Sequence, residues 1–488
     1  MQLTISEYIK GVSTWNLKPQ EVFSHYLKKA QSLNPELNAV VRFFDQKVPA
    51  DIAQLPLAWL PLMVKDNILI KGKISSCGSH MLENFTAPYT ATCMENLLNA
   101  WALPLWAANM DEFAMGGSNE TSAFWPVKNP NGTNRIPWGS SWGSAVAVAA
   151  DMAIAALGTD TWGSVRQPAA MCGIVGFKPT YWAVSRYGVV AMASSLDQVG
   201  IFSKTAEDAQ ILFSFLASHD PKDSTSAPKA DEIKKIQKTD SKIYKFFIPQ
   251  EALDEGLDPQ IKTLFLQKLD QLRALGHTVE IKSLPMLKSS LAIYYTLMPS
   301  EVSTNLSRFD GIRFWQQGNT HDYPSLDQYY SAMRAKGFGE EAKRRILLGT
   351  YILSSANYES YYLKALQAQK QLKSNFEDLF NNYDAVLTPT SPESLSCGSL
   401  YCPCKSCWTA CHFSSYVNNL SSRRRASNRS SNYLTYAIRP NSTQYGTTHW
   451  KTIITKKNTD FRQCFSFFQL FSTKICWVLS SLTCLSLE

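Results

Sequence analysis

Residues 137–179 read PWGSSWGSAVAVAADMAIAALGTDTWGSVRQPAAMCGIVGFKP, and most of what this chain reveals starts from them. Segments rich in glycine and serine flank a run of small apolar residues, SAVAVAADMAIAAL. We expect this run to form a helix packed closely against a sheet, because small side chains allow near approach. Upstream, LPLMVKDN at 60–67 places Lys65 directly after a pattern typical of a buried strand.

Strand and helix patterns alternate along the rest of the chain. Strand patterns occur in WLPLMV, KIYKFFIP, HTVEIKSL and YDAVLTPTSP. Helical periodicity covers residues 18–33, where an Asn-Pro pair follows, and then 258–275 and roughly 339–381. The polar segment 219–242 fits either a surface helix or a linker. The alternation predicts an α/β fold.

Length and composition limit the class of protein. With 488 residues, 45% of them hydrophobic, the chain can bury a large core in one big domain or two. It has no run of 18 apolar residues, and its N-terminus lacks the layout of a signal peptide. Before residue 397 only three cysteines occur, which fits a reduced compartment. These features predict a cytoplasmic enzyme without a membrane span.

The positive charge of the chain is concentrated at one end. The net charge is +8, whereas the part from Cys397 onward holds eleven Lys or Arg against two acids. Residues 1–396 therefore sum to −1. Bulk electrostatics give no support for a nucleic-acid surface on this larger part.

Lys65, Ser140 and Ser164 together suit the cleavage of an amide. Such a reaction needs a nucleophile, a base for its proton and support for the oxyanion. A lysine can act as that base only when neutral, and burial favours the neutral form by lowering its pKa. The alternatives for single residues are a loop serine and a paired structural lysine.

With Arg166-Gln167-Pro168 and GFKPT, these segments closely resemble the amidase-signature family. The resemblance implies a large mixed β-sheet surrounded by α-helices over residues 1–395. It makes Ser164 the acylated nucleophile, Lys65 the base and Ser140 the proton relay, which follows a cis peptide bond. It implies no metal. The oxyanion hole would consist of backbone N–H groups across Thr161, Trp162, Gly163 and Ser164.

Four more segments are similar to the A subunits of tRNA-dependent amidotransferases: NMDEFAMG (109–116), SRYGVVAMASSLDQVG (185–200), RFDGIRF (308–314) and AKRRILLGTY (342–351). That resemblance implies glutamine binding by Tyr295 and one arginine of the 344–345 pair, with Arg344 preferred. A packed tyrosine and a solvated basic helix face are the alternatives.

The resemblance also implies a reaction and its partners. Glutamine is hydrolysed through a glutamyl ester of Ser164. The ammonia serves to convert Glu-tRNA(Gln) to Gln-tRNA(Gln). Whether Asp-tRNA(Asn) is also a substrate is left open. A B subunit uses ATP and Mg²⁺, a small C subunit braces the pair, and this chain has no cofactor of its own. The chain lacks a Walker-type phosphate loop, in agreement with ATP binding elsewhere. A stand-alone amidase and an inactive chain remain open as alternatives.

Tryptophan is the first large departure from the family. Nine of the thirteen tryptophans stand where the family pattern has glycine. An indole allows neither positive φ nor close backbone approach cheaply. We hypothesise that the codon is UGA and that the cell reads it as glycine; the alternative is a real tryptophan-lined site. The nine are Trp59, Trp101, Trp106, Trp125, Trp138, Trp142, Trp162, Trp182 and Trp315.

The second departure is the tail, residues 396–488. The resemblance stops after about residue 394, where acids nearly vanish and Ser, Cys, Asn and Phe become frequent. We favour a frameshift near residue 395, because out-of-frame AT-rich sequence has this composition. The basic stretch SSRRRASNR is an RNA-binding alternative. A zinc site is the other alternative, with Cys402, Cys404, Cys407, Cys411 and His412 as ligands in a non-standard spacing.

Overall fold

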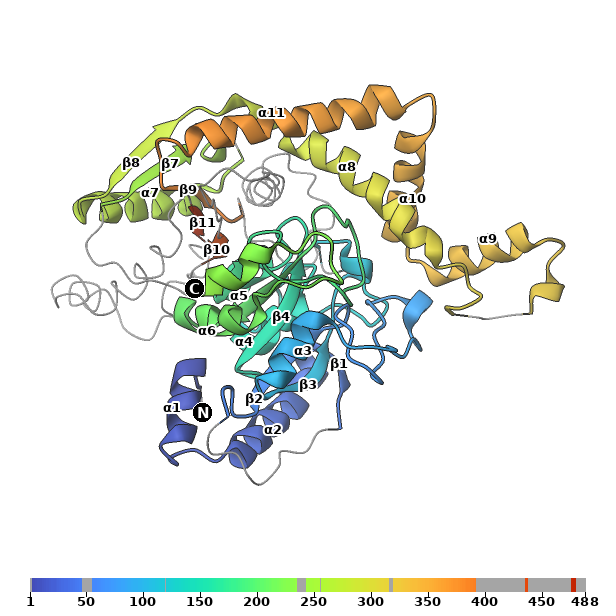
Figure 1. The fold of residues 1–488 in the computed structure, drawn as a ribbon, viewed down its shortest axis with the longest axis horizontal. Coiled ribbons are helices and arrows are strands. Elements are labelled where there is room, and N and C mark those ends of the chain that lie inside the picture. The colour runs from blue at the N-terminus through green and yellow to red at the C-terminus, as the bar shows by residue number, and fades with distance from the viewer. Residues whose placement is uncertain are drawn as a thin grey trace.

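A mixed β-sheet runs through the molecule and carries helices around it (Figure 1). The computed structural model describes residues 2–45, 55–118, 120–234, 243–254, 256–315 and 319–391, and the backbone of two strands beyond them. Among these residues, eleven strands are ordered β1-β3-β2-β4-β6-β5-β10-β11-β9-β7-β8. Antiparallel pairs are β1/β3, β4/β6, β5/β6 and β5/β10, and the other neighbours are parallel. The predicted α/β class with a mixed sheet is confirmed.

The elements follow one another in short steps. The strands are β1 (Val40–Phe43), β2 (Leu60–Lys65), β3 (Ala102–Ala108), β4 (Ala155–Asp160), β5 (Val175–Lys178), β6 (Gln198–Ser203), β7 (Lys245–Pro249), β8 (Thr278–Lys282), β9 (Ala385–Pro389), β10 (Thr435–Ala437) and β11 (Ile475–Leu479). The α-helices are α1 (Ile5–Ser13), α2 (Pro19–Leu37), α3 (Thr92–Asn99), α4 (Trp142–Ala149), α5 (Arg166–Cys172), α6 (Ala206–Leu216), α7 (Pro259–Ala274), α8 (Ser290–Asn305), α9 (Leu326–Gly337), α10 (Glu340–Leu353) and α11 (Lys364–Leu379).

Local sequence explains where several helices begin. Thr4 caps α1, and its side chain and that of Glu7 exchange hydrogen bonds with each other's backbone in a capping box. Asp258 caps α7 by accepting from two backbone N–H groups, and Pro259 stands at the first helical position. Such ends satisfy backbone donors that the helix itself leaves unpaired.

Two apolar clusters hold the fold together. The larger surrounds β2, β4 and β6, whose residues are all buried, and takes in α1 to α6. The smaller joins residues 110–115 to a group of helices in which α8 packs against α10 and α11. Figure 1 shows this helical group along the top of the molecule, with α9 extending from it. The segments that carry Lys65, Ser140 and Ser164 lie in or next to the larger cluster, and Trp162 belongs to the smaller.

Most predicted elements are present, with three corrections. The helical region expected over roughly 339–381 is divided, because α10 ends at Leu353 and a π-helix at Tyr358–Leu363 leads into α11. The expected helix over SAVAVAADMAIAAL is wrong in its second half: α4 ends at Ala149 and β4 begins at Ala155. Asp151 adopts a φ of 60°, and Met152 N–H bonds to Ala147 O, which terminates the helix. Helix α2 also continues through Pro35, where we expected it to end. That proline falls in the last turn, where it disturbs few helical hydrogen bonds.

Several expectations concern residues outside the described part of the chain. The segment 219–242 contains a 3₁₀-helix at Pro228–Lys234, and its remainder from 235 lies outside. The frameshift near residue 395, the cysteine cluster and the basic stretch also lie outside it. Only the backbone of β10 and β11 is described in the tail, and these strands pair between β5 and β9. In the described residues, no helix combines the length and apolarity of a membrane span.

Candidate active site

Lys65 ends strand β2 and is completely buried. Its Nζ lies 2.8 Å from Ser140 Oγ, 2.9 Å from Thr159 Oγ1 and 3.3 Å from Thr159 O. All three are neutral oxygens. Burial lowers the pKa of this amine to about 7, although the more distant carboxylates of Asp111, Asp160 and Asp197 act in the opposite direction. A substantial fraction of the amine is therefore neutral near pH 7.

Ser140 sits in a tightly packed turn before α4. The Gly139–Ser140 peptide bond is cis, as the family resemblance implied. Ser140 O accepts from Asp111 N–H at 3.2 Å, and Ser141 N–H donates to Ser164 O, also at 3.2 Å. A Cβ at Gly139 would lie 1.9 Å from Asp111 Oδ2, so a side chain there is excluded. The turn thus connects the residues of Lys65 and Ser164.

Asp160 organises the loop that presents Ser164. Its carboxylate accepts from the backbone N–H groups of Gly163 and Val165, at 2.9 and 3.1 Å. It also forms a fully buried ion pair with Arg166, with contacts of 2.9 and 2.7 Å. Burial alone would raise the pKa of Asp160, but the Arg166 guanidinium and these hydrogen bonds lower it to about 2. One ionised carboxylate therefore fixes residues 160–166.

The predicted oxyanion residues lie on this loop, but their N–H groups are not equivalent. Gly163 N–H points to Asp160, so it is engaged away from any oxyanion. Thr161 is held by a second carboxylate, because its hydroxyl donates to Asp197 at 2.6 Å. The indole of Trp162 stacks on Tyr294, with ring centroids 3.4 Å apart and planes inclined by 14°. It lies between the loop and helix α8.

Tyr295 and the two arginines come from the helical group. Arg344 pairs with Glu341, and its side chain is 53% exposed. Arg345 is buried; its guanidinium lies 5.9 Å from the centre of the Tyr295 ring and also bonds to Glu341. The structure therefore places Arg345 against Tyr295, whereas the sequence led us to prefer Arg344. The two differ because adjacent helical residues point about 100° apart.

The sequence reasoning gave no role to the buried acids, four of which lie on or next to the segments of this site: Asp111, Glu112, Asp160 and Asp197. Each stood inside a segment quoted for other reasons, such as NMDEFAMG or SLDQVG. The available signal was an acid within an otherwise small or apolar segment, because such acids are rarely buried without partners. Asp111 is notable since its Oδ2 is buried and has no hydrogen-bond partner among the described residues, while Oδ1 accepts from Thr121 at 2.7 Å.

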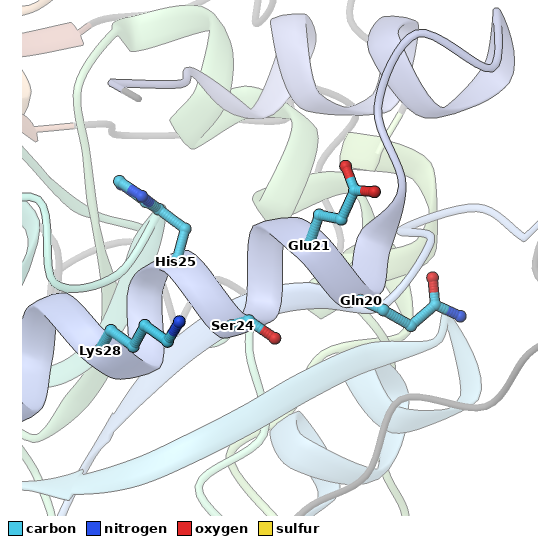
Figure 2. Close-up of a pocket in the computed structure, with 5 residues that line it drawn as sticks. All are labelled: Gln20, Glu21, Ser24, His25 and Lys28. Atoms are coloured by element: carbon cyan, nitrogen blue, oxygen red, sulfur yellow. The ribbon is translucent and has the colours of Figure 1, made fainter.

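A separate surface feature does not belong to this set. Helix α2 carries a surface pocket of about 450 Å³. The side chains that line it spread away from the helix rather than converging on one point (Figure 2). Nor do the described residues contain a group of three or more His, Cys, Asp or Glu able to hold a metal ion. The pocket is lined by Gln20, Glu21, Ser24, His25 and Lys28.

Fold and site together define the class. The family model of the amidases matches residues 21–396, and the chain belongs to the amidase family. A relative, the A subunit of glutamyl-tRNA(Gln) amidotransferase from Carboxydothermus hydrogenoformans, is 43% identical over 404 residues, which cover 80% of this chain and 82% of the relative.

Solved structures agree with this class. The A subunit of glutamyl-tRNA(Gln) amidotransferase from Thermotoga maritima superposes with a TM-score of 0.70 and 35% identity, and the match covers 86% of each chain. The native peptide amidase of Stenotrophomonas maltophilia gives a TM-score of 0.67 at 23% identity, covering 86% of this chain and 88% of that one. The second likeness concerns the fold alone.

We predict that Asp160→Asn destabilises the protein by about 3–5 kcal/mol, because it leaves the buried Arg166 guanidinium without its counter-charge. The free energy of unfolding in urea measures this. Because the pKa of Asp160 is lower in the folded protein than in the unfolded chain, its contribution is fully present above about pH 4. It is lost as the pH falls toward 2.

The matched control is Asp270→Asn. Asp270 pairs with Arg273 on the surface of α7, and its side chain is 72% exposed. Its loss should change the unfolding free energy by no more than about 0.5 kcal/mol. Equal effects of the two substitutions would contradict the role given to Asp160.

Proposed function

We propose that this protein is the glutamine-hydrolysing subunit of a tRNA-dependent amidotransferase. The observation that carries the proposal is the 2.8 Å hydrogen bond between the buried amine of Lys65 and the hydroxyl of Ser140. The backbone N–H of Ser141, the next residue, donates to the backbone carbonyl of Ser164, which supports placing the two serine segments side by side. Following the family resemblance, we assign the roles of base, relay and nucleophile to Lys65, Ser140 and Ser164.

The proposed chemistry moves one proton through the relay. Neutral Lys65 takes the proton of Ser140 as Ser140 takes that of Ser164, whose Oγ attacks the side-chain carboxamide carbon of glutamine. Backbone N–H groups of residues 161–164 stabilise the oxyanion, with Gly163 engaged elsewhere in this conformation. Collapse returns the proton to the leaving nitrogen, releases ammonia and leaves a glutamyl ester. Water then hydrolyses that ester along the same path.

The glutamine site is proposed between the Ser164 loop and the helical group. Arg345 is the arginine we assign to the α-carboxylate of glutamine, because it is buried beside Tyr295 and a guanidinium binds carboxylates through two parallel hydrogen bonds. Glu341 holds the same guanidinium from within α10. The name and 43% identity of the Carboxydothermus relative support glutamine as substrate over a general amide.

By the same likeness, the ammonia is used by a partner. We propose a cytoplasmic complex with a B subunit, which uses ATP and Mg²⁺ to activate glutamate on tRNA(Gln), and a small C subunit that braces the two. An amidase that acts alone would hydrolyse simple amides at full rate without these partners. Glutaminase activity that rises with B subunit, ATP and Glu-tRNA(Gln) distinguishes the complex from that amidase.

One observation favours an inactive protein if the printed tryptophans are real. The stack of Trp162 on Tyr294 places an indole between the Ser164 loop and helix α8, where the glutamine site is proposed. Its centroid separation of 3.4 Å is shorter than the usual 4.5–7 Å of aromatic pairs. With glycine at position 162 this space is free for substrate. Activity thus depends on which residue the cell inserts.

Backbone conformation supports glycine at the tryptophan positions. Among the described residues, twelve non-glycine residues have positive φ, and six of them are tryptophan, a residue that makes up only 13 of 488. A left-handed conformation costs a residue with Cβ about 1–2 kcal/mol but suits glycine. The six are Trp15, Trp59, Trp101, Trp125, Trp138 and Trp315.

Two of these positions end helices in the manner of glycine. At the end of α1, Trp15 N–H donates to Val12 O at 3.0 Å and Asn16 N–H to Gly11 O at 2.9 Å. This is the Schellman arrangement, whose left-handed residue is usually glycine. Trp101 follows the end of α3 with a φ of 65°. Trp15 thereby joins the nine positions identified from the family pattern.

Four indoles are buried at a cost. The Nε1 groups of Trp59, Trp106, Trp138 and Trp142 are buried without a hydrogen-bond partner among the described residues. Each such donor costs about 1–3 kcal/mol. We therefore propose that the codons of ten tryptophans, the nine at family glycine positions and Trp15, are UGA. The cellular protein would then carry glycine at these ten positions.

Peptide sequencing by mass spectrometry of the protein from its native cells tests this proposal. We expect glycine at positions 138, 142 and 162, because Trp138 has a φ of 63°, Trp142 buries an indole N–H without a partner among the described residues, and the Trp162 indole fills the proposed substrate space. Peptides without any tryptophan position serve as the internal control and should match the printed sequence. Tryptophan at these three positions would refute the recoding.

For the chain with glycine at the ten positions, assembled with its partners, we predict glutaminase activity that rises with pH through about 7. The reason is that Lys65 must lose its proton to act as base, and its pKa is lowered to about 7. Lys65→Arg should reduce kcat by about 10²–10⁴, since a guanidinium keeps its proton. Lys71, an exposed lysine downstream, provides the control Lys71→Arg, for which full activity is expected.

The two arginines of α10 form a second test. Arg345→Ala should raise the KM for glutamine at least about 30-fold, because it removes the buried partner of the substrate carboxylate. Arg344→Ala should change KM less than about threefold, since the Arg344 side chain is largely solvated. Steady-state kinetics decide, and the opposite ranking would restore Arg344 as the ligand.

A further inference from the structure

Glu112 is a buried carboxylate for which the proposed reaction has no use. It is 2% exposed and follows Asp111 at the start of a short 3₁₀ segment, Glu112–Ala114. Its Oε1 accepts from the hydroxyl of Ser79 at 2.5 Å. Both of its oxygens accept from the backbone N–H of Gly339, at 3.1 and 2.9 Å. Gly339 is the N-cap residue of helix α10.

The contact with α10 is close, and a side chain at position 339 would displace the Glu112 carboxylate. A Cβ at position 339 would lie 2.6 Å from Glu112 Oε2, which is closer than real Cβ atoms approach an oxygen. The Ser79 hydroxyl lies 3.3 Å from Gly337 O at the end of α9, so three chain segments meet at this carboxylate. A negative charge also suits the positive end of a helix dipole. Glu112 therefore fixes where α10 begins.

The same helix carries Arg345. Arg345 lies five positions after Glu340, the first residue of α10, which corresponds to about 7.5 Å along a rigid helix. Displacement of the helix end thus moves the guanidinium by a similar amount. Glycine at position 349 lets α10 approach α8 closely, since a Cβ there would lie 1.9 Å from Pro299 O. Through its hydrogen bonds to Gly339, Glu112 connects the start of α10 to the segment around Asp111 and Glu112.

That segment is attached to the catalytic serines at its other side. Asp111, the neighbour of Glu112, donates its N–H to Ser140 O at 3.2 Å and packs against Gly139. Adjacent residues of one short segment therefore contact the relay serine and the helix of Arg345. Burial raises the pKa of Glu112 to about 7, while the Ser79 and Gly339 hydrogen bonds and the charges of His80 and Lys343 act the opposite way.

We propose that Glu112 is a positioning residue that sets α10 relative to the Ser140 turn and so places Arg345 for the carboxylate of glutamine. The role rests on the proposed glutaminase function. Glu112 touches neither the reacting atoms nor the substrate. Its removal should therefore weaken the recognition of glutamine while the serine chemistry continues.

The test compares two substrates in the full-length chain with glycine at the ten positions and its partners present. One is glutamine, and the other is a short primary amide without a carboxylate. We assay at about pH 8.5, where Glu112 is ionised and Lys65 is neutral. Glu112→Ala should raise the KM for glutamine about tenfold or more and leave kcat within about threefold. Its kcat/KM for the simple amide should stay within about twofold of the parent.

Two further variants separate positioning from simple loss of stability. Glu340→Ala is the matched control, because Glu340 lies in the first turn of α10 with a side chain that is 92% exposed. Its kinetic constants for both substrates should equal those of the parent. Gly339→Ala should reproduce the glutamine defect by forcing a Cβ against Glu112. The double variant Glu112→Ala, Gly339→Ala should be no worse than Glu112→Ala, because the clash is then removed.

The outcomes assign failure to one proposal or the other. Equal losses on both substrates, or an unchanged glutamine KM in Glu112→Ala with an active parent, would reject the positioning role alone. A parent that hydrolyses the simple amide but never glutamine would reject the proposed function together with this role. Additive effects in the double variant would also reject it, since Glu112 and Gly339 would then act independently.

Discussion

Everything in this site depends on an amine that folding removes from water without giving it a carboxylate partner. Lys65 stands at the end of a fully buried strand, and within the described part of the chain its amine is hydrogen-bonded to neutral oxygens of Ser140 and Thr159. An ion-paired lysine in the same place would keep its proton and could accept none. Two of the nearby acids are instead hydrogen-bonded to other groups, Asp160 to the nucleophile loop and Asp197 to Thr161.

Sequence reasoning could propose the serine and lysine positions because each sits in a short segment with a characteristic pattern, and the structure brings Lys65 and Ser140 within hydrogen-bonding distance. It preferred Arg344 over Arg345, whereas the structure buries Arg345 beside Tyr295, because the choice depends on the rotation of α10 about its axis and on which side α8 covers. It also missed Asp160 and Glu112. Their roles come from hydrogen bonds to backbone groups, in the case of Glu112 to a residue 227 positions away, and no local pattern records such contacts.

The division of SAVAVAADMAIAAL into helix and strand shows a different limit. Small apolar residues fit a buried helix and a buried strand equally well, and periodicity cannot separate them. The decision comes from the turn at Asp151, whose carboxylate is held by Lys29 and Lys204 on other elements. Tertiary contacts of this kind end a helix that propensity alone would continue.

The order of strands has a consequence for the tail. Strands β10 and β11 lie between β5 and β9, so the sheet is continuous only because residues beyond 391 enter it. A protein that ended earlier would leave two open edges, each with a row of unpaired N–H and C=O groups. Open edges recruit strands from other molecules. The reading frame of residues 396–488 therefore bears on whether these edges are covered, and so on self-association of the polypeptide, apart from any effect on catalysis.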